Sequence, residues 1–251
     1  MNLKDFLSAF QQFCILDFIV VALCFGSAFY VHNIDHPANF VPFLLSDIDN
    51  QLSEEIISDV YIVASTALVG AIVSCCLWIT KKVDLSILKV LSSYLFAVAF
   101  TDLITAVLQY IVGRPRPDTL ALCGSLEECS NVLNPEKMRY QFRSLPSGNS
   151  AQSMAGSIFT TFLLCNIWES SSLFSTIFKF SPICFSLFIG SLEITNRTNH
   201  VDDVVMGYFI GALVGFITFS TFKSGIENDK DGSSGYTRGG NRHELLSSKR
   251  I

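Results

Sequence analysis

The chain has 251 residues, of which 50% are hydrophobic and only 16% are charged. A soluble domain of this length usually carries about a quarter charged residues, and the mean hydropathy of +0.44 is high for such a domain. The formal net charge is −5, and no segment is basic enough to predict nucleic-acid binding. The composition excludes an ordinary soluble protein and predicts a membrane protein.

Six apolar stretches follow one another along the chain. They cover residues 13–31, 60–80, 87–108, 150–168, 173–194 and 204–222. About 20 apolar residues are enough for a helix to cross the hydrocarbon core of a bilayer. None of the stretches has the polar stripe that a helix of a soluble bundle shows, although Lys179 and Pro182 interrupt the start of the fifth. The sequence therefore predicts an all-α fold, a six-transmembrane helical bundle over residues 1–222.

The distribution of Lys and Arg predicts the orientation in the membrane. With a cytosolic N-terminus, eleven of the 17 basic residues fall in cytosolic segments and six in outer segments. Both termini of this multi-pass protein are therefore expected in the cytosol, in the plasma membrane or an endomembrane. After residue 222 the composition shifts to Gly, Ser and mixed charge, so residues 223–251 are expected to form a disordered cytosolic tail.

Six of the eight cysteines fall in apolar stretches and are expected to act as small hydrophobic residues. Cys123 and Cys129 instead flank a short polar segment in the longest outer loop, where an oxidising compartment favours a disulfide. Neither His nor Cys recurs at metal-ligand spacing, so we predict no metal and no cofactor. Asp102 lies inside the third stretch, where we expect it to make an interhelical polar contact.

Three polar segments lie at membrane boundaries on the predicted outer face: residues 113–118, 145–149 and 195–203. Any one of them alone is typical of a loop at the headgroup level. Together they indicate a phosphate site, because a helical bundle can bring them to one end. Arg116 offers planar donors suited to phosphate oxygens. Ser147 and Gly148 open a helix, where N–H groups and the helix dipole favour an anion.

These segments resemble the motifs of the lipid phosphate phosphatases of the type 2 phosphatidic acid phosphatase (PAP2) superfamily. In that family the first motif is Lys, six residues and Arg-Pro, the second is Pro-Ser-Gly-His, and the third is Ser-Arg, five residues, His, three residues and Asp. The resemblance covers most of the chain from the second stretch to Phe222 and implies the family's six-helix bundle. The positions that match are Arg116, Pro117, Pro146, Ser147, Gly148 and Asp203.

Five motif positions depart from the family. Its lysine falls on Gln109, its second-motif histidine on Asn149, its third-motif serine and arginine on Leu192 and Glu193, and its nucleophilic histidine on Asn199. In the family's mechanism one histidine attacks phosphorus and another protonates the leaving oxygen, and an asparagine amide does neither. Gln for Lys removes one positive charge and Glu for Arg changes the charge by two, which disfavours a phosphomonoester of about −1.5 to −2.

The resemblance therefore implies a catalytically degenerate relative that binds membrane lipids by their headgroups or regulates other membrane proteins, as a homo-oligomer or together with related phosphatases. An active lipid phosphatase with a rewired site is the alternative, acting on phosphatidate, lysophosphatidate or diacylglycerol pyrophosphate. It would use Arg116, His200 and Asp203, because His200 and Asp203 are spaced to share a helix face. We favour His200 as a bystander, since many family members carry a second histidine there that is not the nucleophile. A transporter is disfavoured, because the polar residues gather at one boundary and do not line the midplane.

Overall fold

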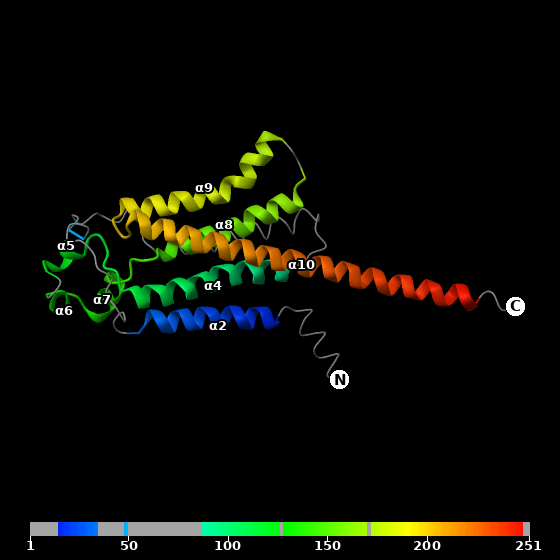
Figure 1. Ribbon diagram of the computed structural model, residues 1–251, viewed down its shortest axis with the longest axis horizontal. Helices are drawn as coiled ribbons and strands as arrows, with labels where there is room; N and C mark the ends of the chain where they lie inside the picture. Colours follow the sequence, from blue (N-terminus) through cyan, green and yellow to red (C-terminus); the bar gives the residue numbers. More distant parts are fainter. Residues whose placement is uncertain (1–14, 35–47, 50–86, 126–127, 170–171, 248–251) are drawn as a thin grey trace.

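The computed structural model describes residues 15–34, 48–49, 87–125, 128–169 and 172–247, and within these ranges it contains helices and no strand. The all-α prediction is confirmed. The long helices are α2 (Ile15–His32), α4 (Ile87–Val112), α8 (Gly148–Ile167), α9 (Leu173–Thr195) and α10 (Val201–Ser247), and they lie lengthwise beside one another (Figure 1). The short helices α5 (Thr119–Cys123), α6 (Cys129–Val132) and α7 (Pro135–Gln141) lie between α4 and α8 in the chain.

Four helical segments of the described residues are long and apolar enough to cross a membrane: Ile15–His32, Leu88–Val112, Leu173–Thr195 and Val201–Ile226. They support an integral membrane protein. The count of six spans is not confirmed. The predicted second span, residues 60–80, lies outside the described residues, and the predicted fourth span corresponds to α8, which is helical but less apolar.

The lower hydropathy of α8 follows from its place in the bundle. This helix packs against α4, α9 and α10, and most of its residues are buried. The hydroxyl groups of Ser153 and Ser186 lie 2.9 Å apart, and Ser157 donates a hydrogen bond to the carbonyl oxygen of Pro182 at 2.7 Å. Small and hydroxyl-bearing side chains suit a helix that faces other helices on several sides, because backbones can approach and bond across the interface.

Three glycines spaced by four residues bring α10 close to α8. A Cβ atom at Gly211 would lie 2.1 Å from the carbonyl oxygen of Ala151, and the shortest such distances at Gly207 and Gly215 are 2.6 and 2.5 Å. Only glycine fits at such a close backbone approach. The contact aligns the amino-terminal ends of α8 and α10, which carry the second and third polar segments.

The helix of α10 continues to Ser247, and in Figure 1 it projects well beyond the other helices. The sequence predicts a disordered tail from residue 223 onward, and α10 is continuous past that point to Ser247. The disorder of the tail stays a prediction.

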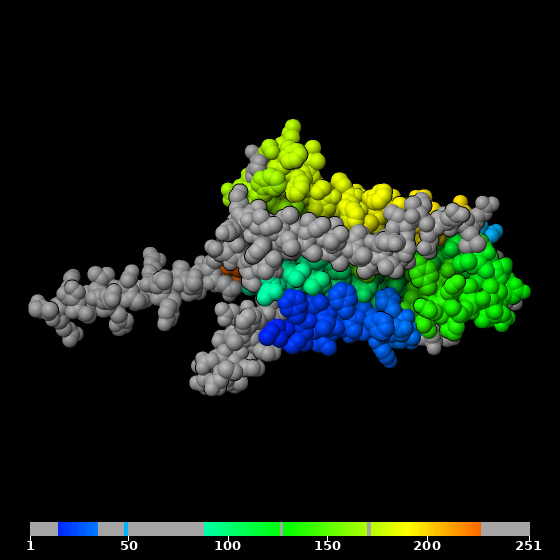
Figure 2. All heavy atoms as spheres, turned by 180° about the vertical axis from the view of Figure 1, so that it is seen from behind, coloured from blue at the N-terminus to red at the C-terminus, as the bar shows by residue number. Residues whose placement is uncertain are grey.

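The segment between α4 and α8 forms one end of the molecule, shown in green in Figures 1 and 2. Gly113 ends α4 with a left-handed φ of 63°, and its N–H donates to the carbonyl oxygen of Gln109 at 3.0 Å. A disulfide joins Cys123 in α5 to Cys129 in α6. In Figure 1, α2 begins and α10 extends at the opposite end of the bundle.

Candidate functional site

The three polar segments meet at the end of the bundle formed by residues 113–147. The side-chain amide of Gln109 donates to the carbonyl oxygen of Pro146 at 2.7 Å, which joins the end of α4 to the second segment. Nη1 of Arg116 donates to the carbonyl oxygen of Thr198 at 3.0 Å, which joins the first segment to the third. The positions that the motif register selects are thus assembled in space.

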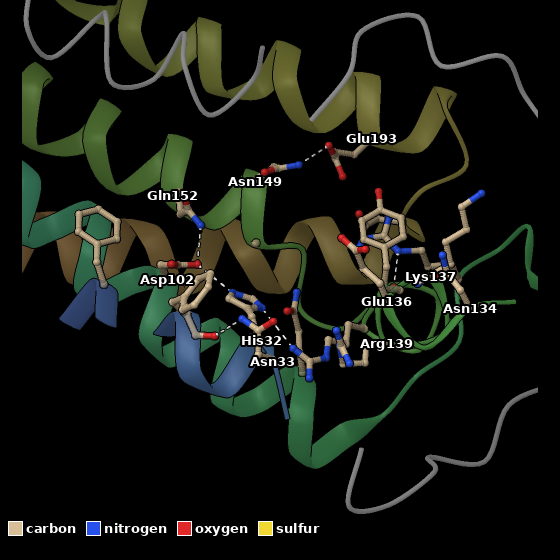
Figure 3. Close-up of a pocket in the computed structure, with 18 residues that line it drawn as sticks. His32, Asn33, Asp102, Asn134, Glu136, Lys137, Arg139, Asn149, Gln152 and Glu193 are labelled. Atoms are coloured by element: carbon tan, nitrogen blue, oxygen red, sulfur yellow. Dashed lines mark hydrogen bonds and ion pairs between the residues drawn. The ribbon is translucent and has the colours of Figure 1, made fainter. Parts of the chain in front are cut away.

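A cavity of about 950 Å³ lies at this junction (Figure 3). Its apolar wall includes Phe25 and Phe29 of α2, which carry 40% and 72% exposed surface and lie on a helix apolar enough to span the membrane. Its polar wall contains most of the motif positions, which are Gln109, Arg116, Gly148, Asn149, Glu193 and Asn199. Six of the residues that the motif register selects therefore line one cavity.

Arg116 is the matching basic residue of the first motif, and it is buried in the cavity wall. Its Nε donates to the carbonyl oxygen of Tyr140 at 3.1 Å, and its guanidinium carbon lies 3.7 Å from the centre of the Tyr140 ring. With Nη1 bound to Thr198, the other terminal nitrogen, Nη2, makes no hydrogen bond to the described part of the chain. Arg116 is therefore anchored through Nε and Nη1, and both N–H groups of Nη2 are without a hydrogen bond to the described residues.

Ser147 and Gly148 have different roles at the start of α8. Ser147 is fully buried and caps the helix, because its hydroxyl accepts the backbone N–H of Ser150 at 3.3 Å. Gly148 and Asn149 form the first turn of α8 and line the cavity. The first turn of α8, which is the positive end of its dipole, therefore forms part of the cavity wall, while Ser147 is not among the lining residues.

Asn149 and Glu193 are bonded to each other. Nδ2 of Asn149 donates to Oε1 of Glu193 at 3.0 Å, and the hydroxyl of Thr198 donates to Oε2 at 3.1 Å. Only 2% of the surface of Glu193 is exposed. A histidine and an arginine occupy these two positions in the family motifs, whereas here an amide holds a buried carboxylate at the cavity wall (Figure 3).

The orientation of two side-chain amides follows from their partners. Nδ2 of Asn199 donates to the carbonyl oxygen of Ser144 at 2.6 Å, and Nε2 of Gln109 donates to the carbonyl oxygen of Pro146. A carbonyl oxygen only accepts, so each amide must turn its nitrogen toward the backbone. The side-chain oxygens of Gln109 and Asn199 are then left as acceptors, on two residues that line the cavity.

His200 and Asp203 pair as their spacing predicted, with Nδ1 of His200 3.0 Å from Oδ2 of Asp203. The same carboxylate oxygen accepts the backbone N–H of His200 at 2.9 Å and the hydroxyl of Ser144. Asn199 lines the cavity, but His200 is not among the described residues that do so. The pair therefore lies outside the cavity lining, which instead contains Asn199, the residue on which the motif register places the nucleophile.

Arg114 is a residue of the site that the sequence analysis did not single out. Its Nη1 lies 2.5 Å from Oδ2 of Asp202 and 2.7 Å from Oδ1 of Asp203. Burial alone would lower the pKa of Arg114, but the hydrogen bond to Asp202 and the charge of Asp203 outweigh it and raise that pKa. One feature of the sequence could have pointed to Arg114, namely its position two residues before Arg116 inside a segment already identified as polar.

His200, Asp202 and Asp203 form a group of ligand-type atoms, all within 4.8 Å of one another. Three such side chains are enough to suggest a metal site. Here, however, the guanidinium of Arg114 already binds both carboxylates. A divalent cation would have to displace this fixed positive charge, so the group does not suit a metal.

A second polar group, which links three helices, also lines the cavity. Oδ1 of Asp102 on α4 accepts from Nε2 of Gln152 on α8 at 2.8 Å and lies 3.3 Å from Nε2 of His32 on α2. The expected interhelical role of Asp102 is confirmed. Nη1 of Arg143 lies 3.3 Å from Nδ1 of His32. Because a guanidinium only donates, this Nδ1 must accept, and the proton of His32 sits on Nε2 toward Asp102.

Arg143 also forms hydrogen bonds with the backbone at the end of α2. Its Nη2 donates to the carbonyl oxygens of Val31 and Ile34 at 3.1 and 3.0 Å. Burial, followed by the nearby charge of Arg139, lowers the pKa of Arg143. The sequence analysis assigned no role to His32 or Arg143, because nothing in the local pattern indicates partners 70 and 111 residues away.

Comparison with known proteins supports the family resemblance. The model of the PAP2 superfamily matches residues 90–226. Human phospholipid phosphatase 2 is 29% identical over 148 residues, which cover 53% of this chain and 51% of the human protein. The probable diacylglycerol pyrophosphate phosphatase 1 of Schizosaccharomyces pombe is 26% identical over 146 residues, or 52% of each chain.

Diacylglycerol pyrophosphate phosphatase 1 of Saccharomyces cerevisiae is 26% identical over 129 residues, or 45% of each chain. The matched regions span about half the length of these relatives. No solved structure gives a significant match. The family match covers more than half of the chain, from α4 to the apolar part of α10, and it contains every motif position discussed above. This chain belongs to the PAP2 superfamily.

Proposed function

We propose that this PAP2-superfamily membrane protein is catalytically degenerate and binds a membrane lipid in the cavity without hydrolysing it. The observation that carries the proposal is the place of Asn199. It holds the position of the family's nucleophilic histidine, lines the cavity, and uses its Nδ2 to bind the carbonyl oxygen of Ser144. The lipid-phosphatase names of the relatives support a lipid as the ligand.

The family's chemistry needs a nucleophile and a proton donor on either side of the phosphorus. Asn199 and Asn149 have side-chain amides that are poor nucleophiles and do not titrate near neutral pH. The loss of one nucleophile from a cooperating set lowers kcat by about 10⁶-fold in a well-studied hydrolase. The replacement of both histidines therefore argues against turnover by the family route.

Charge at the site also argues against a phosphomonoester substrate. Glu193 is buried at the cavity wall where the family has an arginine, and Gln109 is neutral where the family has a lysine. Arg116 is the one motif cation that this chain retains among these positions. Among the motif positions, a dianionic phosphate would meet one guanidinium and a buried carboxylate, and low-dielectric surroundings strengthen the repulsion from that carboxylate.

The membrane location and topology that we propose follow from the apolar helices and from the distribution of Lys and Arg. We propose a multi-pass protein of the plasma membrane or an endomembrane with both termini in the cytosol and the cavity near the outer or luminal surface. Lipids with phosphate-containing headgroups are its proposed ligands. Self-association, or association with related phosphatases, would place this binding site beside active enzymes.

A phosphate-release assay on the purified protein tests the proposal. With phosphatidate, lysophosphatidate and diacylglycerol pyrophosphate as substrates, we expect no release above a heat-treated control. Asn199→His alone should stay inactive, because Glu193, Gln109 and Asn149 are unchanged. The fourfold variant Gln109→Lys, Asn149→His, Glu193→Arg and Asn199→His should have the better chance of turnover.

The same assay examines the rewired alternative, which rests on the 3.0 Å contact between His200 and Asp203. If that pair is catalytic, the natural protein releases phosphate and His200→Ala abolishes the release. Such a result would make the protein an enzyme and overturn the proposal.

A further inference from the structure

We propose that Arg143, a residue outside the three family motifs, binds the phosphate group of a monoanionic phosphodiester lipid together with Arg116. This inference rests on the proposed function, in which the cavity holds an intact lipid. It goes further by assigning a second anion-binding residue and by naming the class of headgroup. Phosphatidylglycerol is a simple lipid of that class.

The guanidinium of Arg143 is buried in the cavity lining and has no acidic partner among the described residues. Only 5% of the surface of Arg143 is exposed, and the residue lines the cavity. Its terminal nitrogens contact the ring of His32 and the carbonyl oxygens of Val31 and Ile34, which are all neutral. Within the described part of the chain no ion pair joins Arg143 to a carboxylate, and Asp102 reaches it only through the His32 ring.

Arg143 also has a donor that the described residues do not satisfy. Its Nε is buried and makes no hydrogen bond to them. A guanidinium stays protonated in proteins, so the cost of burial cannot be relieved by loss of the proton. The nearby positive charge of Arg139 adds to that cost. A buried charge that lacks a counter-charge and a hydrogen bond calls for a ligand, an ion or water, and an anion in the cavity supplies the missing charge.

Arg116 is a second buried guanidinium of the same kind. Its side chain contacts the carbonyl oxygens of Thr198 and Tyr140 and the Tyr140 ring, so it too lacks a carboxylate partner among the described residues. The carbonyl oxygen of Tyr140 accepts Nε of Arg116 at 3.1 Å and the backbone N–H of Arg143 at 3.3 Å. This shared acceptor brings the side chain of Arg116 next to the backbone of Arg143. Two guanidiniums in one cavity wall suit phosphate oxygens, because each offers planar donors.

The charges of the whole lining favour a monoanion. Among the charged lining residues that are less than 10% exposed, Arg116 and Arg143 are cations and Glu193 is a carboxylate, which leaves one positive charge. The other charged residues of the lining are two cations and two carboxylates: Lys137, Arg139, Asp102 and Glu136. These four balance in number, and His32 is neutral because its Nδ1 accepts from Arg143. A phosphodiester carries one negative charge and matches this sum, whereas a phosphomonoester brings about −1.5 to −2.

The layout of the cavity suits a diester, which continues on both sides of the phosphate. Phe25 and Phe29 of α2 form an apolar wall on a helix apolar enough to span the membrane. Arg143 binds the end of that helix and follows α7 in the chain. In Figure 3, Asp102 and Lys137 of α7 lie on opposite sides of the cavity. A lipid whose acyl chains lie along the phenylalanines would place its phosphate beside Arg143 and its head alcohol toward α7, and about 950 Å³ leaves room for both.

Native mass spectrometry of the purified full-length protein tests the inference. The probes are phosphatidylglycerol, phosphatidylcholine and phosphatidate with identical acyl chains, added singly and in competition near neutral pH. We expect phosphatidylglycerol to bind about tenfold more tightly than phosphatidylcholine, whose choline group brings a positive charge into a lining that is already positive. Phosphatidate should bind no more tightly than phosphatidylglycerol. In Arg143→Gln the ratio should fall to about one, because the charge of the buried lining residues then sums to zero.

The matched control is Arg197→Gln, which removes the same charge from an arginine of the third polar segment that is not among the described lining residues. It should leave the ratio unchanged. A second measurement does not depend on the folding of a variant. Glycerophosphoglycerol should raise the melting temperature of the natural protein more than glycerophosphocholine or inorganic phosphate does, since a ligand of the folded state stabilises it in proportion to its affinity.

Equal binding of phosphatidylglycerol and phosphatidylcholine, tighter binding of phosphatidate, or an unchanged ratio in Arg143→Gln would each overturn the inference. A larger rise in melting temperature with inorganic phosphate would also overturn it, because the site would then take free phosphate in place of a lipid diester. Its failure is distinguishable from failure of the proposed function. A protein that releases phosphate but keeps the preference that depends on Arg143 contradicts only the proposed function. A protein without turnover and without this preference contradicts only the assignment of Arg143 and of the headgroup.

Discussion

Nη1 of Arg114 lies 2.7 Å from Oδ1 of Asp203, a carboxylate with no exposed surface. This ion pair joins the segment that follows α4 to the first turn of α10. Oδ2 of the same carboxylate accepts from Ser144 and from the backbone N–H of His200. The backbone carbonyl oxygen of Asp203 also accepts the N–H of Ser147 at 3.0 Å, so Asp203 contacts all three polar segments.

Replacement of Arg114 by Gln should destabilise the protein by about 3–5 kcal/mol, because it leaves a buried carboxylate without its counter-charge. The matched change is Asp202→Asn at the other partner of Arg114, whose side chain is 65% exposed. It should alter stability by less than about 1 kcal/mol, since exposed ion pairs contribute little. Denaturant unfolding in detergent measures both. Equal effects of the two substitutions would contradict a structural role for Asp203.

Replacement of Gly211 by Ala should lower stability by about 1–3 kcal/mol, because the added methyl group would meet the backbone of Ala151 and push α10 away from α8. Gly26→Ala is the matched control, since a Cβ atom at Gly26 meets nothing within 4 Å on α2. It should be neutral or stabilising by up to about 1 kcal/mol through helix propensity. Thermal unfolding of the two variants separates these outcomes. A tolerated Gly211→Ala would mean that the helices are less closely packed than described.

The paired substitution of Cys123 and Cys129 by Ser should reduce the free energy of unfolding by about 2–3 kcal/mol, the amount expected from closure of a short loop. Cys165→Ser, at an exposed cysteine outside this disulfide, should leave stability nearly unchanged. Mass spectrometry of peptides prepared without reduction should find the two cysteines joined. Two unmodified thiols would contradict the prediction and an oxidising environment for this segment.

A tag that follows residue 251 should be protected in intact cells or sealed vesicles, while a tag inserted at residue 125 should be accessible from the outside or lumen. The reason is the excess of Lys and Arg on the side of the termini. The arrangement in Figure 1 is compatible, because α2 begins and α10 extends at the end opposite to the segment between α4 and α8. Accessibility of the C-terminal tag from outside would reverse the topology.

The motif register was the part of the site that the sequence could predict. Gln109, Asn149, Glu193 and Asn199 were selected by counting from retained Arg, Pro, Gly and Asp residues, and all four line one cavity. Such counting works because helix starts and tight turns hold these positions in a constant spatial relation. Chemistry at each position could then be deduced from residue type alone.

Other features depend on contacts that no local pattern reveals. His32 meets Asp102 and Arg143 across helices, and the orientation of each amide becomes known only when its backbone partner is seen. Hydropathy also failed to distinguish α8, a helix surrounded by other helices, from the lipid-facing ones. Its serines and threonines face protein, so a span there cannot be judged by apolar length alone.

Trapping of a phosphorylated intermediate tests the central claim most directly. The purified natural protein is incubated with an equal amount of radiolabelled lysophosphatidate, quenched under alkaline conditions that preserve phosphohistidine, and mapped by mass spectrometry. Since Asn199 holds the nucleophile position and His200 is not among the described residues that line the cavity, we predict no labelled protein and no released phosphate. A phosphohistidine at His200 that disappears in His200→Ala would contradict this account.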